Sequence, residues 1–207
     1  MPRSAIPLAF LLLAALPAAA QTAPPAEAEI GSWRLACRVD RMTDRAACAL
    51  RHRDWVERPG GSLPGLSLEV IDRGGRLVPA VLARDLTLEG ASRGLLALTG
   101  AAQLRFSPKA MLELPCTLDG RSVVCAPRAE DAARAEQDLL GADRALVRMV
   151  GSGGSGTAAE PVELRLSGTR EAVARFAREA PPGSAPAESP GLDPREMVQR
   201  LLRLFGN

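Results

Sequence analysis

Four cysteines are the residues whose spacing points most directly to chemistry. They form two close pairs along the chain, Cys37 with Cys48 and Cys116 with Cys125. If residues 119–122 form a four-residue turn, Cys116 faces Cys125 across two antiparallel strands, at a separation that a disulfide can bridge. The same count places Cys37 opposite Cys48. Sequence alone leaves other pairings open, and this geometry favours the two local disulfides.

Zinc binding is the competing interpretation of the cysteines, because thiolates are also zinc ligands. None of the cysteine spacings is C-x-x-C, and His52 is the only histidine of the chain. We therefore predict no metal site and no cofactor. An even number of cysteines paired in disulfides is typical of proteins that leave the cytoplasm.

His52 is the one histidine that could act as a general acid or base. Strand alternation places it on the face of Cys48, Leu50 and Asp54, and the Asp54 carboxylate is close along the chain. A periplasmic hydrolase that uses His52 with nearby carboxylates is one alternative, and it requires His52 to line a pocket. Because no nucleophile motif surrounds the histidine, we favour a half-buried structural residue and predict no enzymatic activity.

Trp55 alternates with Arg51 and Arg53 on the opposite face of the same segment, which should be the outer face. An exposed tryptophan flanked by arginines has the composition of an interface hot spot. The end of a strand that is covered by the following loop would give the same pattern. Both interpretations stay open, and the first predicts that Arg51, Arg53 and Trp55 bind a partner.

The C-terminal segment has the signals of an amphipathic helix over residues 193–207. Asp193 is a candidate N-cap and is followed by proline at the first helical position. Met197, Leu201 and Phe205 lie on one apolar face. A helix of this length is marginal alone in water, so it needs a surface to lie on. We favour docking on its own domain, with a partner protein or a membrane surface as the alternatives.

The N-terminus is typical of a cleavable signal peptide over residues 1–20. Arg3 precedes an apolar stretch over residues 6–16, and small residues ending at Ala20 follow it. This stretch is too short to span a membrane. The first mature residue is Gln21 and not the cysteine that lipid attachment needs. We therefore expect a mature chain in the periplasm or at the cell surface.

The elements that must position these residues are mostly β. Alternating apolar residues predict a disulfide-bonded domain over residues 31–180, built as a compact antiparallel sandwich or barrel with one or two packed helices. The helices are predicted over residues 129–140 and 169–180. A flexible segment over residues 21–30 precedes the domain, and a proline-rich linker over residues 181–192 follows it.

The formal net charge of the chain is only +2 at pH 7. Nucleic-acid-binding domains are usually strongly basic, so we predict no nucleic-acid partner. These observations together predict a non-enzymatic exported protein that binds a protein or cell-envelope partner. The sequence leaves the identity of that partner and the oligomeric state open.

Several short motifs follow one another in a recognisable order. They are G-S-W-R-L-A-C at 31–37, C-A-L at 48–50, Cys116, C-A at 125–126, and V-E-L-R-L-S-G at 162–168 before a helix with Phe176. In this order they resemble the invasion-associated locus B family of exported bacterial proteins. The resemblance implies a mostly β periplasmic or cell-surface protein with disulfides and no known catalytic site. It also implies a family linked, in some pathogens, to host-cell invasion.

This chain departs from the family pattern at some positions. It has Val-Cys at 124–125 where the family usually has Gly-Cys. The apolar Pro-Leu-Gly segment in the middle of the family pattern has no counterpart here. The proline-rich linker and the terminal helix also fall outside the pattern, so the resemblance covers roughly residues 31–180.

Overall fold

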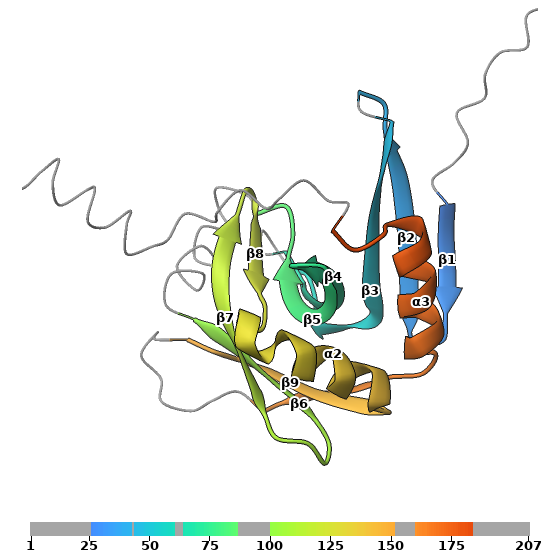
Figure 1. Ribbon diagram of the computed structural model, residues 1–207. Helices are drawn as coiled ribbons and strands as arrows, with labels where there is room; N and C mark the ends of the chain where they lie inside the picture. Colours follow the sequence, from blue (N-terminus) through green and yellow to red (C-terminus); the bar gives the residue numbers. More distant parts are fainter. Residues whose placement is uncertain (1–25, 43, 61–63, 87–99, 152–159, 184–207) are drawn as a thin grey trace, which may run out of the picture.

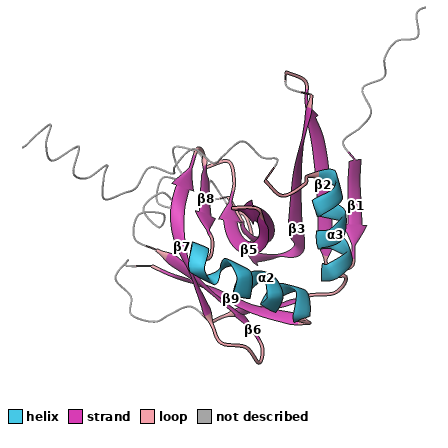
Figure 2. Ribbon diagram, viewed as in Figure 1, coloured by secondary structure: helices cyan, strands magenta, loops and turns pink. Residues whose placement is uncertain are grey.

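The structure is a computed structural model that describes residues 26–42, 44–60, 64–86, 100–151 and 160–183. In these residues ten strands form one antiparallel sheet in the order β1-β2-β3-β4-β5-β8-β7-β6-β9-β10 (Figures 1 and 2). The strands are β1 (Ala26–Ile30), β2 (Trp33–Asp40), β3 (Arg45–Glu57), β4 (Leu66–Arg73), β5 (Arg76–Ala83), β6 (Ala101–Phe106), β7 (Leu112–Asp119), β8 (Ser122–Cys125), β9 (Arg144–Val150) and β10 (Val162–Arg165). The sheet curls around one main core without closing, which confirms the mostly β fold.

Several predicted segments lie outside the described residues. They are the signal peptide over residues 1–20, most of the linker over residues 181–192, and the terminal helix with Met197, Leu201 and Phe205. In the part of the chain that the structure describes, no helix is long and apolar enough to cross a membrane.

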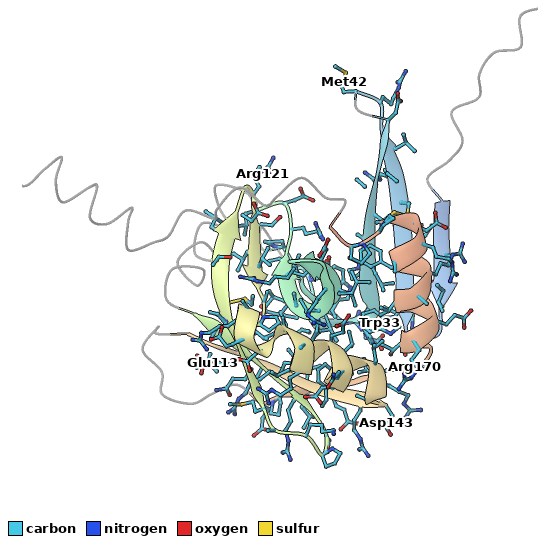
Figure 3. The ribbon with its side chains drawn as sticks, viewed as in Figure 1. Trp33, Met42, Glu113, Arg121, Asp143 and Arg170 are labelled. Atoms are coloured by element: carbon cyan, nitrogen blue, oxygen red, sulfur yellow. A yellow bond between two sulfur atoms is a disulfide. The ribbon has the colours of Figure 1, made fainter. Side chains whose placement is uncertain are left out.

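The hairpin of β2 and β3 has the predicted register. Cys37 lies opposite Cys48, and Trp33 lies opposite His52 on the same face. The residues between these point to the opposite face of the sheet, because successive side chains of a strand alternate in direction. The hairpin extends beyond the rest of the sheet, and Met42 near its tip is 92% exposed (Figure 3).

The prediction of a flexible segment over residues 21–30 is wrong for residues 26–30, which form β1 and pair with β2. Alternating alanine and glutamate is too polar to signal a strand, and the stabilising contacts come from the neighbouring strand. Ile30 enters the core, with 7% of its surface exposed. Arg34 of β2 forms ion pairs with Glu27 and Glu29, at 3.1 and 2.8 Å.

Strand β7 carries the sheet around a corner. Its first half, from Leu112, pairs with β6, and its second half, from Cys116, pairs with β8. Cys116 lies opposite Cys125, as the predicted turn requires. One strand therefore joins the group that contains β8 to the group that contains β6, β9 and β10.

Two helices cover parts of the sheet, at the predicted places (Figure 1). A short 3-10 helix, η1 (Ala129–Asp131), leads into α2 (Ala132–Gly141), and α3 (Thr169–Glu179) follows β10. Helix α2 buries Leu139 and packs against β5. Helix α3 buries Phe176 and packs against β1, β2 and β3.

Although β1 and β10 do not pair, residues 31–33 and 165–169 from the two ends of the sheet contact each other at what we call the closing junction. The Ser32 N–H donates to the Ser167 carbonyl at 2.9 Å, and the two serine hydroxyls lie 3.0 Å apart. Gly31 has a positive φ of 58°, and a Cβ at this position would lie 2.2 Å from the Ser167 carbonyl oxygen. Only glycine fits there, so the motif G-S-W meets the motif L-S-G for a packing reason.

Candidate functional site

His52, the predicted acid or base, lies in the core and is 1% exposed. Its Nε2–H donates to the Arg165 carbonyl at 2.9 Å, and its Nδ1 accepts from the Asp54 backbone N–H at 3.0 Å. Nδ1 lies closer to this N–H than to the Asp54 carbonyl oxygen at 3.2 Å, so Nδ1 is assigned as the acceptor and Nε2 as the donor. Both ring nitrogens are thus occupied by backbone groups.

The hydrolase alternative required His52 to line a pocket, and the structure places His52 in the core instead. The ring packs edge-on against Trp33, with 5.5 Å between the ring centroids. The Trp33 Nε1–H donates to the Thr169 hydroxyl at 3.0 Å. His52 and Trp33 therefore link β3, β2 and α3 to one another.

The four cysteines form the two predicted disulfides, Cys37–Cys48 and Cys116–Cys125. The second disulfide is buried in the core, whereas the first is half-buried on the extended hairpin. All four thiols are bonded, so none is left to bind zinc. Among the residues that the structure describes, no group of three or more His, Cys, Asp or Glu side chains could hold a metal ion.

Trp55 is half-buried beneath the loop that follows β3. The guanidinium of Arg51 lies over its ring, 4.5 Å from the centroid. On the ring edge, a Cβ at Gly65 would lie 2.6 Å from two ring carbons, so the backbone of that loop touches the indole. Arg53 is exposed. The structure brings Arg51 and Trp55 together as a cation–π pair and leaves Arg53 accessible beside them.

Sequence reasoning missed a buried carboxylate on the outer face of β4. Glu69 of β4 is 1% exposed, although alternation places it on the outer face of the strand. The Arg84 Nε–H donates to both of its carboxylate oxygens, at 3.2 and 3.1 Å, and the Ser67 hydroxyl donates at 3.0 Å. These hydrogen bonds to Glu69 raise the pKa of Arg84 above its ordinary value.

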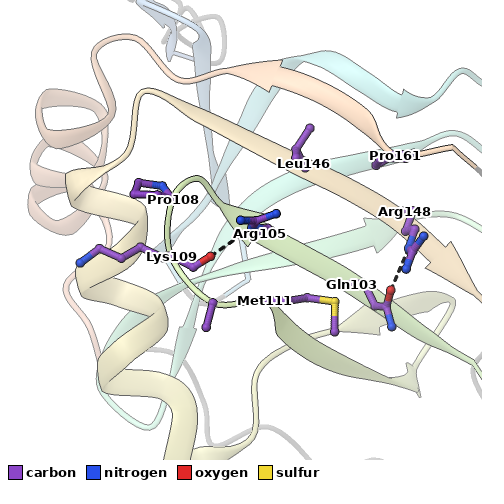
Figure 4. A pocket seen from close by; sticks show the side chains of 9 residues that line it. Gln103, Arg105, Pro108, Lys109, Met111, Leu146, Arg148 and Pro161 are labelled. Carbon is purple, nitrogen blue, oxygen red and sulfur yellow. Dashed lines mark hydrogen bonds between the residues drawn. The ribbon is translucent and has the colours of Figure 1, made fainter.

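Sequence reasoning also missed a cleft of about 580 Å³ on the outer face of β6 and β9 (Figure 4). Its walls combine cationic and apolar side chains. They come from Gln103, Arg105, Pro108, Lys109, Ala110, Met111, Leu146, Arg148 and Pro161. The available signal was alternation, because the residues between these on both strands are the buried apolar ones.

Comparisons with known proteins give one structural similarity. The crystal structure of invasion associated protein B from Bartonella henselae matches 74% of this chain and 96% of its own chain. The sequence identity is 12% and the TM-score is 0.45, a level of likeness that carries no information on function. No protein-family model matches the sequence, and no curated protein matches it either.

Proposed function

We propose that the chain is a non-enzymatic exported protein that binds a partner in the cell envelope. The observation that carries this proposal is the pair of disulfides that bonds all four cysteines. Such crosslinks form and persist in oxidising compartments, such as the bacterial periplasm or the cell surface. The predicted signal peptide over residues 1–20 supports the same location.

The geometry of His52 supports the non-enzymatic part of the proposal. It is the only histidine of the chain, and both its ring nitrogens bind backbone groups inside the core. A general base must reach the proton that it abstracts, and this ring reaches no open surface. The bonded cysteines likewise offer no thiolate for nucleophilic catalysis.

We further propose distant membership of the invasion-associated locus B family. The support is the order of motifs in the sequence, together with the closing junction that gives G-S-W and L-S-G a shared structural role. Because some members of that family are linked to host-cell invasion, contact with a host surface is included in the proposal.

The location is tested by fractionating cells that produce either the full chain or a chain that lacks residues 2–20. We expect the full chain in the periplasmic or surface fraction with all four cysteines oxidised. The shortened chain should stay in the cytoplasm with free thiols that react with an alkylating reagent. A full chain that is found in the cytoplasm with free thiols would contradict export.

The binding part is tested by affinity capture from the cell envelope with the chain that begins at Gln21. Parallel captures use a chain without residues 192–207, the variant Arg53→Glu, and the control Arg178→Glu on α3. We expect capture by the intact chain and the control. Loss on truncation assigns binding to the predicted terminal helix, and loss in Arg53→Glu assigns it to the outer face of β3. Capture by none of the proteins contradicts an envelope partner.

A further inference from the structure

The cleft on the outer face of β6 and β9 is distinguished by its charge. Its ionisable side chains are Arg105, Lys109 and Arg148, and all three are cationic. In Figure 4, Arg105 lies in the middle of the cleft and Lys109 extends away from it at the rim. The register pairs Gln103 with Arg148 and Arg105 with Leu146. The two arginines are therefore diagonal neighbours on one face of the sheet.

The arginines of the cleft are held by neutral groups. The Arg148 Nε–H donates to the Gln103 side-chain oxygen at 2.7 Å, and the Arg105 Nε–H donates to the Lys109 carbonyl at 3.2 Å. Among the described residues, neither guanidinium lies within 4.0 Å of a carboxylate. Both thus keep donors for a further partner. Two like charges on one face also repel each other, and an anion between them would relieve this repulsion.

Two carboxylates border the cleft on the flanking strands, because Glu113 lies opposite Gln103 and Glu163 lies opposite Leu146. Glu113 on β7 lies 3.8 Å from Arg128, and Glu163 on β10 lies 4.0 Å from Arg144. Neither carboxylate lines the cleft. The residues that line the cleft therefore contribute three cations and no carboxylate.

The rest of the cleft is apolar. Met111 is 45% exposed, and Leu146 lies across the cleft from it (Figure 4). Pro108, Ala110 and Pro161 complete these walls. A flexible methionine suits an alkyl chain, because its unbranched side chain adapts to the shape of its partner.

We propose that this cleft binds a monomeric single-chain amphiphile with one carboxylate headgroup. The headgroup accepts hydrogen bonds from Arg105 and Arg148, and the alkyl chain lies on Met111 and Leu146. Planar guanidinium groups match carboxylates in geometry and charge. This assignment rests on the proposed binding function and names a ligand class for it.

The test is titration calorimetry of the disulfide-bonded chain with dodecanoate below its micelle concentration. We expect saturable binding of dodecanoate, and none of acetate or of dodecyltrimethylammonium. Acetate lacks the alkyl chain, and the ammonium compound reverses the charge of the headgroup. Binding of both dodecyl compounds with equal affinity would overturn the role of the arginines, and binding of acetate as tight as that of dodecanoate would overturn the role of the apolar walls.

Two double variants locate the site. Arg105→Gln/Arg148→Gln should weaken dodecanoate binding about tenfold or more, because each loses charge-assisted hydrogen bonds. The control Arg170→Gln/Arg178→Gln removes the same charge from α3 and should bind as the original chain does. Met111→Asp should also weaken binding, since it places a carboxylate on the apolar wall. Equal affinity for dodecanoate in all variants overturns the proposal. Binding of the protein to vesicles of anionic lipid, without binding of dodecanoate, also overturns it.

The same variants separate this proposal from the proposed function. Suppose that dodecanoate fails to bind while capture of an envelope partner persists in Arg105→Gln/Arg148→Gln. Then the ligand assignment is wrong and the binding function stands. Failure of capture by the intact chain contradicts the binding function itself, whatever the calorimetry gives.

Discussion

At the scale of single residues, the buried ion pair between Glu69 and Arg84 shows how a charge can be misinterpreted from sequence. The pattern of β4 is L-S-L-E-V, in which glutamate occupies a position that alternation assigns to the outer face. The structure buries that face as well, and Ala80 opposite Glu69 is 0% exposed. A buried carboxylate needs a partner because desolvation of a charge is costly, and Arg84 supplies it.

Replacing Arg84 should therefore destabilise the fold. Removal of one partner from a buried pair costs about 3 to 5 kcal/mol. Arg84→Met should lower the free energy of unfolding by about 2 to 3 kcal/mol, since water reaches the 50% exposed arginine side chain. The double variant Glu69→Leu/Arg84→Met should recover most of this loss. Urea unfolding of each variant measures these differences.

The exposed pair of Arg76 with Glu136 is the matched control for this cycle. Its partners are 52% and 26% exposed, so Arg76→Met should cost about 1 kcal/mol or less. An Arg84→Met variant as stable as the Arg76→Met variant would show that Glu69 does not depend on its partner.

The cysteines and His52 show which contacts of single residues can be predicted from the sequence. The disulfides were predictable because each joins two neighbouring strands of one hairpin, with sequence separations of 11 and 9. The face that His52 occupies was predictable for the same reason. Its partner, the Arg165 carbonyl, was not, because it is 113 residues away and no local pattern specifies that contact.

At the scale of elements, β1 is the strand that sequence reasoning missed. It contributes one buried side chain, Ile30, so its apolar pattern is too short to detect. The strand is held by backbone pairing and by Arg34, which contacts Glu27 and Glu29. The hydrogen bond from Arg34, followed by its charge, lowers the pKa of Glu29.

This lowered pKa makes the contribution of Glu29 to stability dependent on pH. A carboxyl whose pKa is lower in the folded state stabilises the protein above its unfolded pKa, here near 4.5. That contribution is lost as pH falls through the lower, folded pKa. The free energy of unfolding of the original chain should thus exceed that of Glu29→Gln at pH 7, and the difference should shrink by pH 3.

Unfolding in low salt at both pH values measures this difference, with Glu179→Gln on α3 as a control. Glu179 is exposed and has no ion pair among the described residues. The effect should be small and should weaken in concentrated salt, because Glu29 lies at the surface. A difference between the original chain and Glu29→Gln that stays constant from pH 7 to pH 3 would count against this account.

At the scale of the whole molecule, the two disulfides lie in different environments. Cys116 and Cys125 are 6% and 0% exposed inside the core, whereas Cys37 and Cys48 are half-buried on the extended hairpin. A reductant must reach a sulfur atom, and a core site becomes accessible only when a large part of the fold opens.

Mild reduction under native conditions should therefore break Cys37–Cys48 first. Alkylation followed by peptide mass spectrometry reports which cysteines are free at each time. The variant Cys37→Ala/Cys48→Ala should stay folded and lose about 2 to 3 kcal/mol of stability. Equal alkylation rates at all four cysteines would mean that the molecule opens as one unit.

The order of strands in the sheet lies beyond what the sequence predicts. Alternation predicts that most of these strands exist, and hairpin turns predict neighbours such as β4 and β5. It does not predict that β8 pairs with β5 or that β7 divides its length between two partners. The cleft depends on this long-range order, because β6 and β9 are separated by β7, β8 and α2 along the chain. In the sequence, the cationic residues that line the cleft stand apart from one another, and no local pattern groups them.

The closing junction also determines when the molecule can finish folding. Ser32 and Ser167 are 135 residues apart, so their contact forms only after nearly all of the described chain has been synthesised. Until then, Trp33 and His52 lack Thr169 and the Arg165 carbonyl as partners. Contacts between distant parts of a chain slow folding. The N-terminal hairpin therefore lacks these partners until β10 and α3 have been made. We expect a chain in this state to be open enough for transport through a membrane channel.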